Sequence, residues 1–157
     1  MKIRIMNKAD IPHVTRIISD AIHPNAAKAA GDDFARCFRP QVKDFYRLLN
    51  FWVAEEEGKA IGIIGVGSLH STPSHVAWMD WFSIAPEYQG KGIGSLLLQH
   101  MQHFLKNKKV SILVVECYLP YGEDAIRFYT KHGFIHVGRI AKYWTHTIDS
   151  VLLVKHL

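Results

Sequence analysis

The amino-acid sequence predicts an α/β fold of the α+β type, in which helices flank a central mixed sheet that is mostly antiparallel. Between Phe51 and Ile84, short connections join three apolar segments, an arrangement typical of an antiparallel meander. Further along, the apolar run Val110–Cys117 follows an amphipathic segment, so strand, crossover helix and strand predict one parallel pair. The length of 157 residues and the 48% apolar content predict a single domain over residues 1–157.

The N-terminal third is expected to contain one strand and then helices. The segment Lys2–Met6 alternates between charged and apolar residues, which predicts a strand, and apolar residues at helical spacing follow from Asp10, a candidate N-cap. The stretch His23–Asp33 is small and polar, so we expect helical structure to resume only after it. Apolar spacing up to Leu49 then predicts two short helices that are separated at Pro40.

The remaining elements are expected in the middle and at the C-terminal end of the chain. A Glu57-Gly58 turn joins the first two strands of the meander, and a loop with Pro73 precedes the third. The predicted strands are Phe51–Ala54, Ala60–Ser68, Val76–Ile84, Val110–Cys117, Phe134–Ile140 and Asp149–Lys155, and the predicted helices are Ile93–Asn107 and Glu123–His132.

The loop Gln89-Gly90-Lys91-Gly92-Ile93-Gly94-Ser95 joins a predicted strand to a predicted amphipathic helix. Glycine lets the backbone turn tightly and approach a ligand, and the first N–H groups of a helix have no intrahelical partner. These donors, the helix dipole and the charge of Lys91 predict a phosphate-binding loop. The spacing matches neither the P-loop nor the dinucleotide fingerprint, because the lysine lies between glycines and Ser95 stands at the third glycine position.

Two motifs in this order resemble the GNAT superfamily of N-acetyltransferases. The pattern Q-x-x-G-x-G, at Gln89, Gly92 and Gly94, is similar to the acetyl-CoA loop of that family. The segment Ala125–Phe134, AIRFYTKHGF, is similar to the family pattern A-x-x-F-Y-x-K-x-G-F. The resemblance implies a GNAT-like sheet whose parallel fourth and fifth strands are splayed apart, with acetyl-CoA as the cosubstrate.

The resemblance also implies where the cosubstrate binds. It implies that Tyr129 protonates the departing thiolate and that a backbone N–H on the strand bearing Ile84 binds the thioester carbonyl. Where many relatives have an Asn that contacts pantetheine, this chain has Gly122, so the contact comes from backbone, from Glu123 or Asp124, or is missing. The implied acetyl-CoA contacts are Phe82, Ser83, Ile84, Gln89, Gly90, Lys91, Gly92, Ile93, Gly94, Ser95, Ala125, Phe128 and Lys131.

The general base is the part of the predicted site for which alternatives stay open. Asp80 shares strand parity with Phe82 and Ile84 and lies among aromatic residues, where desolvation would raise the pKa of its carboxyl group. A structural carboxylate that accepts a neighbouring hydroxyl or N–H explains Asp80 equally well. Glu55 and Glu56, at the end of an earlier strand, are weaker alternatives.

The predicted function is transfer of an acetyl group, by direct attack, to a primary amine of a small molecule or peptide. Tyr143 and Trp144 are candidates to line the acceptor site, although aromatic residues at a sheet edge are commonly packing residues. The alternative is a non-catalytic acyl-CoA-binding module of the same fold, which Gly122 makes conceivable and Tyr129 disfavours. Cys117 is not expected to carry an acyl group, because no histidine constellation can be tied to it.

Composition and charge narrow the partners and the location. The net charge of +5 comes from scattered basic residues without an interleaved aromatic stripe, so nucleic-acid binding is not expected. Among the ten histidines, only His100 and His103 are placed on one helix face, so no metal site is expected. The start of the chain lacks the pattern of a signal peptide and no apolar run could span a membrane. Two cysteines without C-x-x-C spacing suit a reducing compartment, so we expect a cytoplasmic protein, and the resemblance leaves room for a homodimer.

Overall fold

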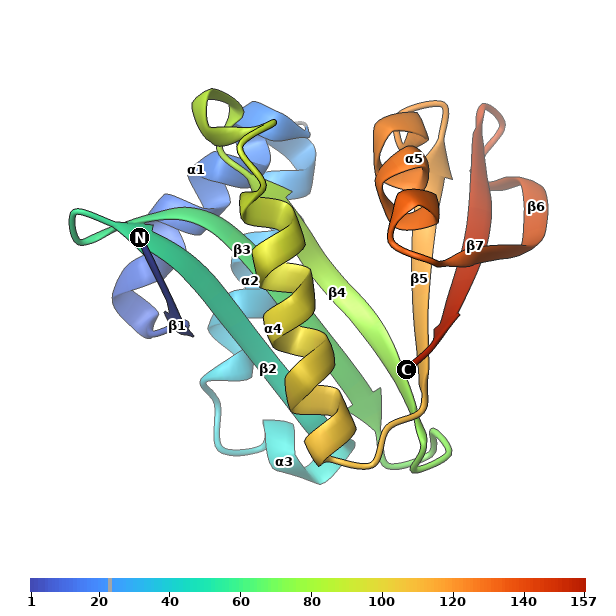
Figure 1. The fold of residues 1–157 in the computed structure, drawn as a ribbon, viewed down its shortest axis with the longest axis horizontal. Helices are drawn as coiled ribbons and strands as arrows, with labels where there is room; N and C mark the ends of the chain where they lie inside the picture. The colour runs from blue at the N-terminus through green and yellow to red at the C-terminus, as the bar shows by residue number, and fades with distance from the viewer. Residues whose placement is uncertain (23) are drawn as a thin grey trace.

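The computed structural model describes residues 1–22 and 24–157, and it contains one seven-stranded sheet with helices on both faces (Figure 1). The strand order is β1-β2-β3-β4-β5-β7-β6; β4 and β5 are parallel, and the other neighbouring pairs of the described sheet are antiparallel. The predicted mixed, mostly antiparallel fold is therefore confirmed. The strands are β1 (Lys2–Ile5), β2 (Tyr46–Glu56), β3 (Lys59–Leu69), β4 (Val76–Ile84), β5 (Ile112–Leu119), β6 (Ile135–Thr145) and β7 (Ile148–His156).

Five α-helices of the described residues pack against this sheet from two sides (Figure 1). On one face, α4 and α5 enclose an apolar core with the strands, centred on Leu97, Met101 and Leu113. On the other face, α1 and α2 enclose a second core around Ile18 and Phe34. The helices are α1 (Ile11–Ala21), α2 (Pro24–Cys37), α3 (Val42–Phe45), α4 (Ile93–Asn107) and α5 (Glu123–Lys131), with short 3-10 helices at Lys8–Asp10 and Pro86–Tyr88.

Helix α2 corrects the prediction that the stretch His23–Asp33 is not helical. The helix begins at Pro24, and His23 itself lies outside the described residues. Four alanines between residues 26 and 30 supply high helix propensity that the polar neighbours concealed. The helix is held in place because Ala30 and Phe34 are fully buried against the sheet.

Strand β2 corrects the prediction of a helix reaching Leu49. Helix α3 ends at Phe45, and the chain from Tyr46 onward pairs with β3, with Leu48 opposite Ser68 and Leu49 opposite Gly67. The apolar residues here fit the helical period and the strand period equally well, and the hydrogen-bonded ladder with β3 stabilises the strand.

Asp10 lies at the N-cap position of α1, as predicted, yet its side chain does not cap that helix. Its carboxylate instead accepts two hydrogen bonds from the Arg4 guanidinium, at 2.6 and 2.8 Å, and one from the Asn7 backbone N–H. Arg4 lowers the pKa of the buried Asp10 carboxyl group. The pair therefore anchors β1 to the start of α1.

Candidate active site

The central feature of the site is a gap within the sheet, between β4 and β5. These strands pair from Val76 to Trp78, opposite Ile112 to Val114, and then diverge (Figure 1). The Ala85 N–H donates to Ile61 on β3, and ladder bonds alternate in direction along a strand. The backbone N–H groups of Phe82 and Ile84 consequently point away from β3, into the gap. This is where the resemblance described above implies a donor for a thioester carbonyl.

A β-bulge in β4 lies next to the point of divergence. Phe82 pairs with Ile64 and Met79 with Val66, so Asp80 and Trp81 together oppose the single residue Gly65. The bulge overturns the predicted parity of Asp80 with Phe82 and Ile84, because the extra residue places Asp80 on the opposite face of the sheet. Phe82 and Ile84 pack on the core below α4, whereas Trp81 packs on the α1–α2 core.

The glycine loop presents unpaired backbone donors at the start of α4. Gly90 and Gly92 have φ values of +73° and +82°, a left-handed conformation that L side chains rarely adopt. The intrahelical bonds of α4 begin with Leu96 N–H to Gly92 O, and the preceding N–H groups have no side-chain cap. A Cβ at Gly92 would project into open space next to these donors. The residues present thus fit a phosphate-bearing ligand.

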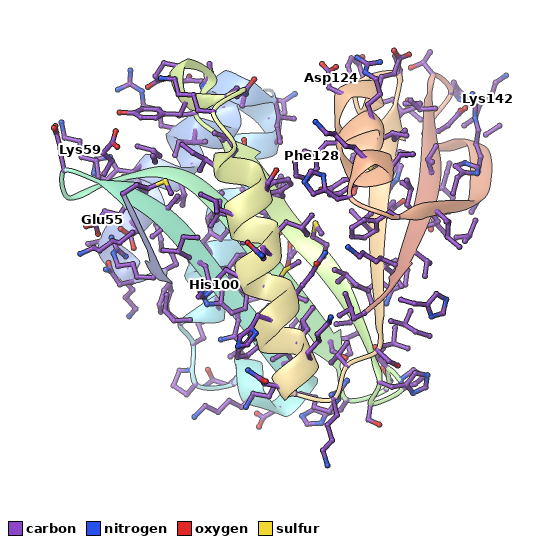
Figure 2. The ribbon with its side chains drawn as sticks, in the orientation of Figure 1. Glu55, Lys59, His100, Asp124, Phe128 and Lys142 are labelled. Atoms are coloured by element: carbon purple, nitrogen blue, oxygen red, sulfur yellow. The ribbon has the colours of Figure 1, made fainter. Side chains whose placement is uncertain are left out.

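Gly94 and Gln89 connect this loop to the gap. A Cβ at Gly94 would lie 3.2 Å from the Phe82 ring and 3.5 Å from the Phe128 ring, so Gly94 is needed for packing between α4, β4 and α5. Figure 2 shows Phe128 on the side of α5 that faces α4. The Gln89 side-chain amide donates to the Ile84 carbonyl at 3.1 Å. Among the other predicted contacts, Ile93 is a core residue and Ser83 pairs with Ile63 on β3.

Tyr129 is held on α5 by aromatic neighbours. Its ring centroid lies 5.2 Å from Phe134, 5.5 Å from Phe128 and 6.1 Å from Phe82. Only 4% of the residue is exposed, and this burial raises its pKa well above the ordinary value of 10.0, with a smaller contribution from Cys117. No residue that the structure describes bonds to its hydroxyl, and this oxygen is not among the buried unpaired atoms, so solvent reaches it. The phenol is therefore a protonated donor without an acceptor in the described part of the chain.

The position of Gly122 has a packing explanation. A Cβ there would lie 2.9 Å from the Tyr118 carbonyl oxygen and 3.1 Å from the Tyr118 nitrogen, distances that would force the β5 backbone to move. The Gly122 N–H also donates to that carbonyl. An Asn, the residue common in the resembled family, would not fit here. Of the other α5 positions, Ala125 packs against the core and Lys131 is exposed in the last turn.

Asp80 faces a small cavity of about 70 Å³ on the α2 side of the sheet. Burial raises the pKa of its carboxyl group, and repulsion by Asp33 adds to the increase, while the Trp81 backbone N–H, 2.8 Å away, opposes it. Asp33 also accepts a hydrogen bond from the Trp81 indole at 3.1 Å. The lining residues are Asp33, Arg36, Cys37, Val42, Tyr46, Leu49 and Asp80. All of them except Asp80 lie between Asp33 and Leu49.

A larger groove of about 510 Å³ runs from Gly92 along α4 to His132. The Ser95 hydroxyl and the His132 Nε2 are 2.9 Å apart, and His132 Nδ1 lies 2.8 Å from the Phe128 carbonyl. A carbonyl only accepts, so Nδ1 donates to it, and in the neutral imidazole Nε2 then accepts from Ser95. Sequence reasoning missed His132 and Gln99; the helical spacing of Ser95, Gln99 and Gln102 is the signal that could have found this wall.

Several other candidates lie apart from the gap or are inactive as acids and bases. Glu55 forms ion pairs with Lys2, at 2.9 Å, and with Arg4. These two cations lower the pKa of its carboxyl group. Glu56, the last residue of β2, raises the pKa of the Tyr88 phenol. Burial raises the pKa of the Cys117 thiol to about 12, so it is not a thiolate at neutral pH.

Tyr143 and Trp144 lie near the end of β6 and are more than half exposed. The Trp144 ring centroid is 5.4 Å from that of Tyr118 and 5.2 Å from that of Tyr143, with nearly perpendicular planes. The Trp144 indole donates to Glu116 on β5 at 2.9 Å. Glu116 and Tyr118 were not identified from the sequence, although alternation along β5 places both opposite its buried residues.

The described residues, 1–22 and 24–157, lack two features that would change this picture. They contain no group of three or more His, Cys, Asp or Glu side chains arranged to hold a metal ion. They also contain no helix that is long and apolar enough to cross a membrane.

Comparisons with known proteins agree with this geometry. A sequence model of the "Acetyltransferase (GNAT) family" matches residues 17–134. N-acetyltransferase family 8 member 5 of Mus musculus is 28% identical to this chain over 118 residues. The matched residues cover 71% of this chain and 52% of the mouse protein. The chain thus spans about half the length of that relative.

Solved structures of low identity share the fold. A GNAT-family protein from Desulfovibrio desulfuricans superposes with a TM-score of 0.88 at 19% identity, covering 99% of this chain and 98% of that one. An aminoglycoside 6'-N-acetyltransferase in complex with coenzyme A superposes with a TM-score of 0.78 at 10% identity, covering 99% and 97%. The predicted family and fold are confirmed, and the contact residues assigned above remain predictions.

Proposed function

The chain belongs to the acetyltransferase (GNAT) family, and from this premise we propose that it transfers the acetyl group of acetyl-CoA to a primary amine of a small molecule or peptide. The observation that carries the proposal is the Tyr129 phenol, whose ring is buried beside the gap between β4 and β5 and whose hydroxyl has no acceptor among the described residues. Solvent reaches this hydroxyl, so it is free to donate to a ligand atom in the gap.

The gap and the glycine loop would hold acetyl-CoA. The N–H groups at the start of α4 and the charge of Lys91 would bind its pyrophosphate. The backbone groups of Phe82 and Ile84 would bond to the pantetheine and thioester part in place of the missing β5 partners. The groove that includes Ser95 and His132 continues from the loop and offers room for the nucleotide end.

Bound acetyl-CoA supplies an activated acyl carbon as a thioester. In the proposed reaction the neutral amine nitrogen forms a bond to that carbon, and the carbon–sulfur bond breaks. The leaving sulfur takes the electron pair of that bond and gains a proton from Tyr129. The attacking nitrogen loses one proton, which Asp80 accepts directly or through water, so atoms and charge balance.

Asp80 suits the role of base because of where the bulge places it. It lies at the point where β4 leaves β5, on the face reached from the cavity rather than from the α4 groove. The raised pKa of its carboxyl group strengthens it as a proton acceptor at neutral pH. Amine and cosubstrate would therefore approach the gap from opposite faces of the sheet.

The second candidate is an acyl-CoA-binding module without turnover. Gly122 favours it, since the residue that contacts pantetheine in many relatives has no room here. One experiment separates the two. Purified protein is incubated with acetyl-CoA and a panel of polyamines, amino acids, aminoglycosides and peptide N-termini, and CoA thiol release is measured.

Release above the rate without amine supports the enzyme, and binding without release by any amine supports the module. The same samples give a melting temperature with acetyl-CoA, CoA, NAD or ATP. Acetyl-CoA at a hundredfold excess over its Kd stabilises a protein by about 2.7 kcal/mol, so a clear increase is expected with the CoA ligands only. Equal stabilisation by NAD contradicts the proposed cosubstrate site.

A further inference from the structure

We propose that the acceptor is a small aliphatic amine with a second positive charge, a diamine or short polyamine, and that Glu116 with Tyr118, Tyr143 and Trp144 binds the second ammonium group. This inference rests on the proposed function, since it names the acceptor of the same site. We call these four residues the aromatic–acid cluster.

The cluster and Asp80 lie on the same face of the sheet. On β5, Val115 and Cys117 are buried in the core below α4 and α5, so alternation directs Glu116 and Tyr118 to the opposite face. On β4, Met79 is buried in that same core, and Asp80 takes the opposite face. The two carboxylates thus flank the gap from neighbouring strands.

Tyr118 lies on the same face of β5 as Glu116, two residues further along the strand. Burial raises the pKa of its phenol to about 12, and the charges of Glu116 and Asp80 both contribute to the increase. Trp78 pairs with Val114, and Asp80 and Glu116 each lie two residues beyond that pair, so the two carboxylates and Tyr118 border the same opening. The structure therefore offers two anionic points joined by an aromatic wall.

The Glu116 carboxylate is positioned but not neutralised. Its Oε1 accepts from the Trp144 indole at 2.9 Å and from the Ser150 hydroxyl at 2.5 Å. Its Oε2 has no partner among the residues that the structure describes. Neither Glu116 nor Asp80 forms an ion pair within that part of the chain, whereas Asp33 is paired with Arg36 at 3.4 Å.

Two unneutralised, partly buried carboxylates stand out in a chain with a net charge of +5. A half-buried carboxylate without a cation is costly, and a bound ammonium group offsets that cost. The three aromatic side chains are 45% to 57% exposed and meet edge to face at Trp144. Aromatic rings around a carboxylate form a favourable environment for an alkylammonium group.

The two ends of a diamine would have different roles. The end next to Asp80 must be neutral to attack the acyl carbon, and it loses a proton on doing so. The end in the aromatic–acid cluster stays protonated and only binds. The Asp80 cavity, at about 70 Å³, has room for an amine and a few methylene groups but not for a bulky side chain.

The test compares acceptors that differ only in the second charge. CoA thiol release is measured with putrescine, and with n-pentylamine, in which a methyl group replaces the second ammonium group of putrescine. We expect kcat/KM for putrescine to exceed that for n-pentylamine at least about tenfold, chiefly through KM, because only the diamine pairs with Glu116.

The Glu116→Gln variant should reduce this putrescine preference at least about fivefold, because the amide keeps the shape and loses the charge. Trp144→Leu, at a half-exposed position, should reduce it as well by removing an aromatic wall. Asp20→Asn is the matched control, since it removes a carboxylate of the exposed Arg16–Asp20 pair on α1 and should preserve the preference.

A second readout does not depend on turnover. With CoA bound, putrescine should raise the melting temperature more than n-pentylamine, and Glu116→Gln should abolish the difference. Amines that react equally well with and without the second charge, or a preference retained in Glu116→Gln, overturn the inference and leave the acetyltransferase proposal standing. No thiol release with any amine defeats the proposed reaction, and the melting temperatures then decide whether the cluster binds diamines.

Discussion

Removal of the Tyr129 hydroxyl is the perturbation that bears most directly on the proposed chemistry. Tyr129→Phe keeps the ring and its packing with Phe82, Phe128 and Phe134. No protein group that the structure describes loses a partner, because the hydroxyl has none there. The free energy of unfolding should therefore change by less than about 1 kcal/mol, and the melting temperature by only a few degrees.

The effect on rate should be larger. A general acid typically contributes about 10²- to 10⁴-fold, equivalent to about 3 to 5 kcal/mol of barrier at about 1.4 kcal/mol for each factor of ten. Water that enters the gap can replace part of this help, so we expect kcat to fall at least about tenfold. Acetyl-CoA affinity should stay nearly constant, since the hydroxyl acts mainly as the thiolate forms.

The assay is steady-state thiol release with a confirmed acceptor, combined with calorimetric titration of acetyl-CoA. Tyr121→Phe is the matched control, because it removes a phenol that is 76% exposed. Since the pKa of Tyr129 is raised, the wild-type rate should show no alkaline loss from this group below about pH 10. Wild-type kcat in Tyr129→Phe would refute the assigned role and leave Tyr129 as a packing residue.

Three further outcomes are expected. Asp80→Asn should lower kcat yet raise the urea midpoint at pH 7, because a raised pKa means that folding disfavours the charged carboxylate; this gain should vanish as the pH falls below the ordinary value of 3.8. Gly92→Val should weaken acetyl-CoA binding at least about tenfold in a titration, because its side chain would enter the space in front of the α4 donors, while circular dichroism shows the helix intact. Asp10→Asn should cost about 2 to 3 kcal/mol in urea unfolding without affecting acetyl-CoA affinity, since it breaks the Arg4 pair. The lowered pKa of Asp10 means that wild-type stability from this pair is lost as the pH falls through that pKa, a slope that Asp10→Asn should lack.

The elements with strong local signals were predicted well. Helix α4 begins at Ile93 and ends at Asn107, as expected, because a glycine loop precedes a long amphipathic pattern. Strand β4 also has the expected bounds. The predictions failed at α2 and at the start of β2, where local composition is ambiguous and contacts with the rest of the fold decide the structure.

The candidate site divides in the same way. The loop glycines and Tyr129 could be found from the sequence because each belongs to a contiguous motif. The side of Asp80 could not, because a bulge changes strand parity without any signal at Asp80 itself. The bulge lies opposite Gly65, where a Cβ would lie 2.2 Å from the Phe51 ring. Glu116 was missed because its partners, Trp144 and Ser150, come from distant strands.

The interrupted pairing of β4 and β5 leaves two strand edges inside the molecule. From the bulge onward, β4 is bonded to β3 on one side, and the facing side of β5 is free beyond Val114. Exposed edges of this kind usually invite pairing with another chain, and proteins protect them with charges, prolines or a covering element. Here α4 and α5 stand over one face of the opening (Figure 1). A linear ligand with amide groups could bond to both edges at once, so the cosubstrate would act as an additional strand that completes the sheet.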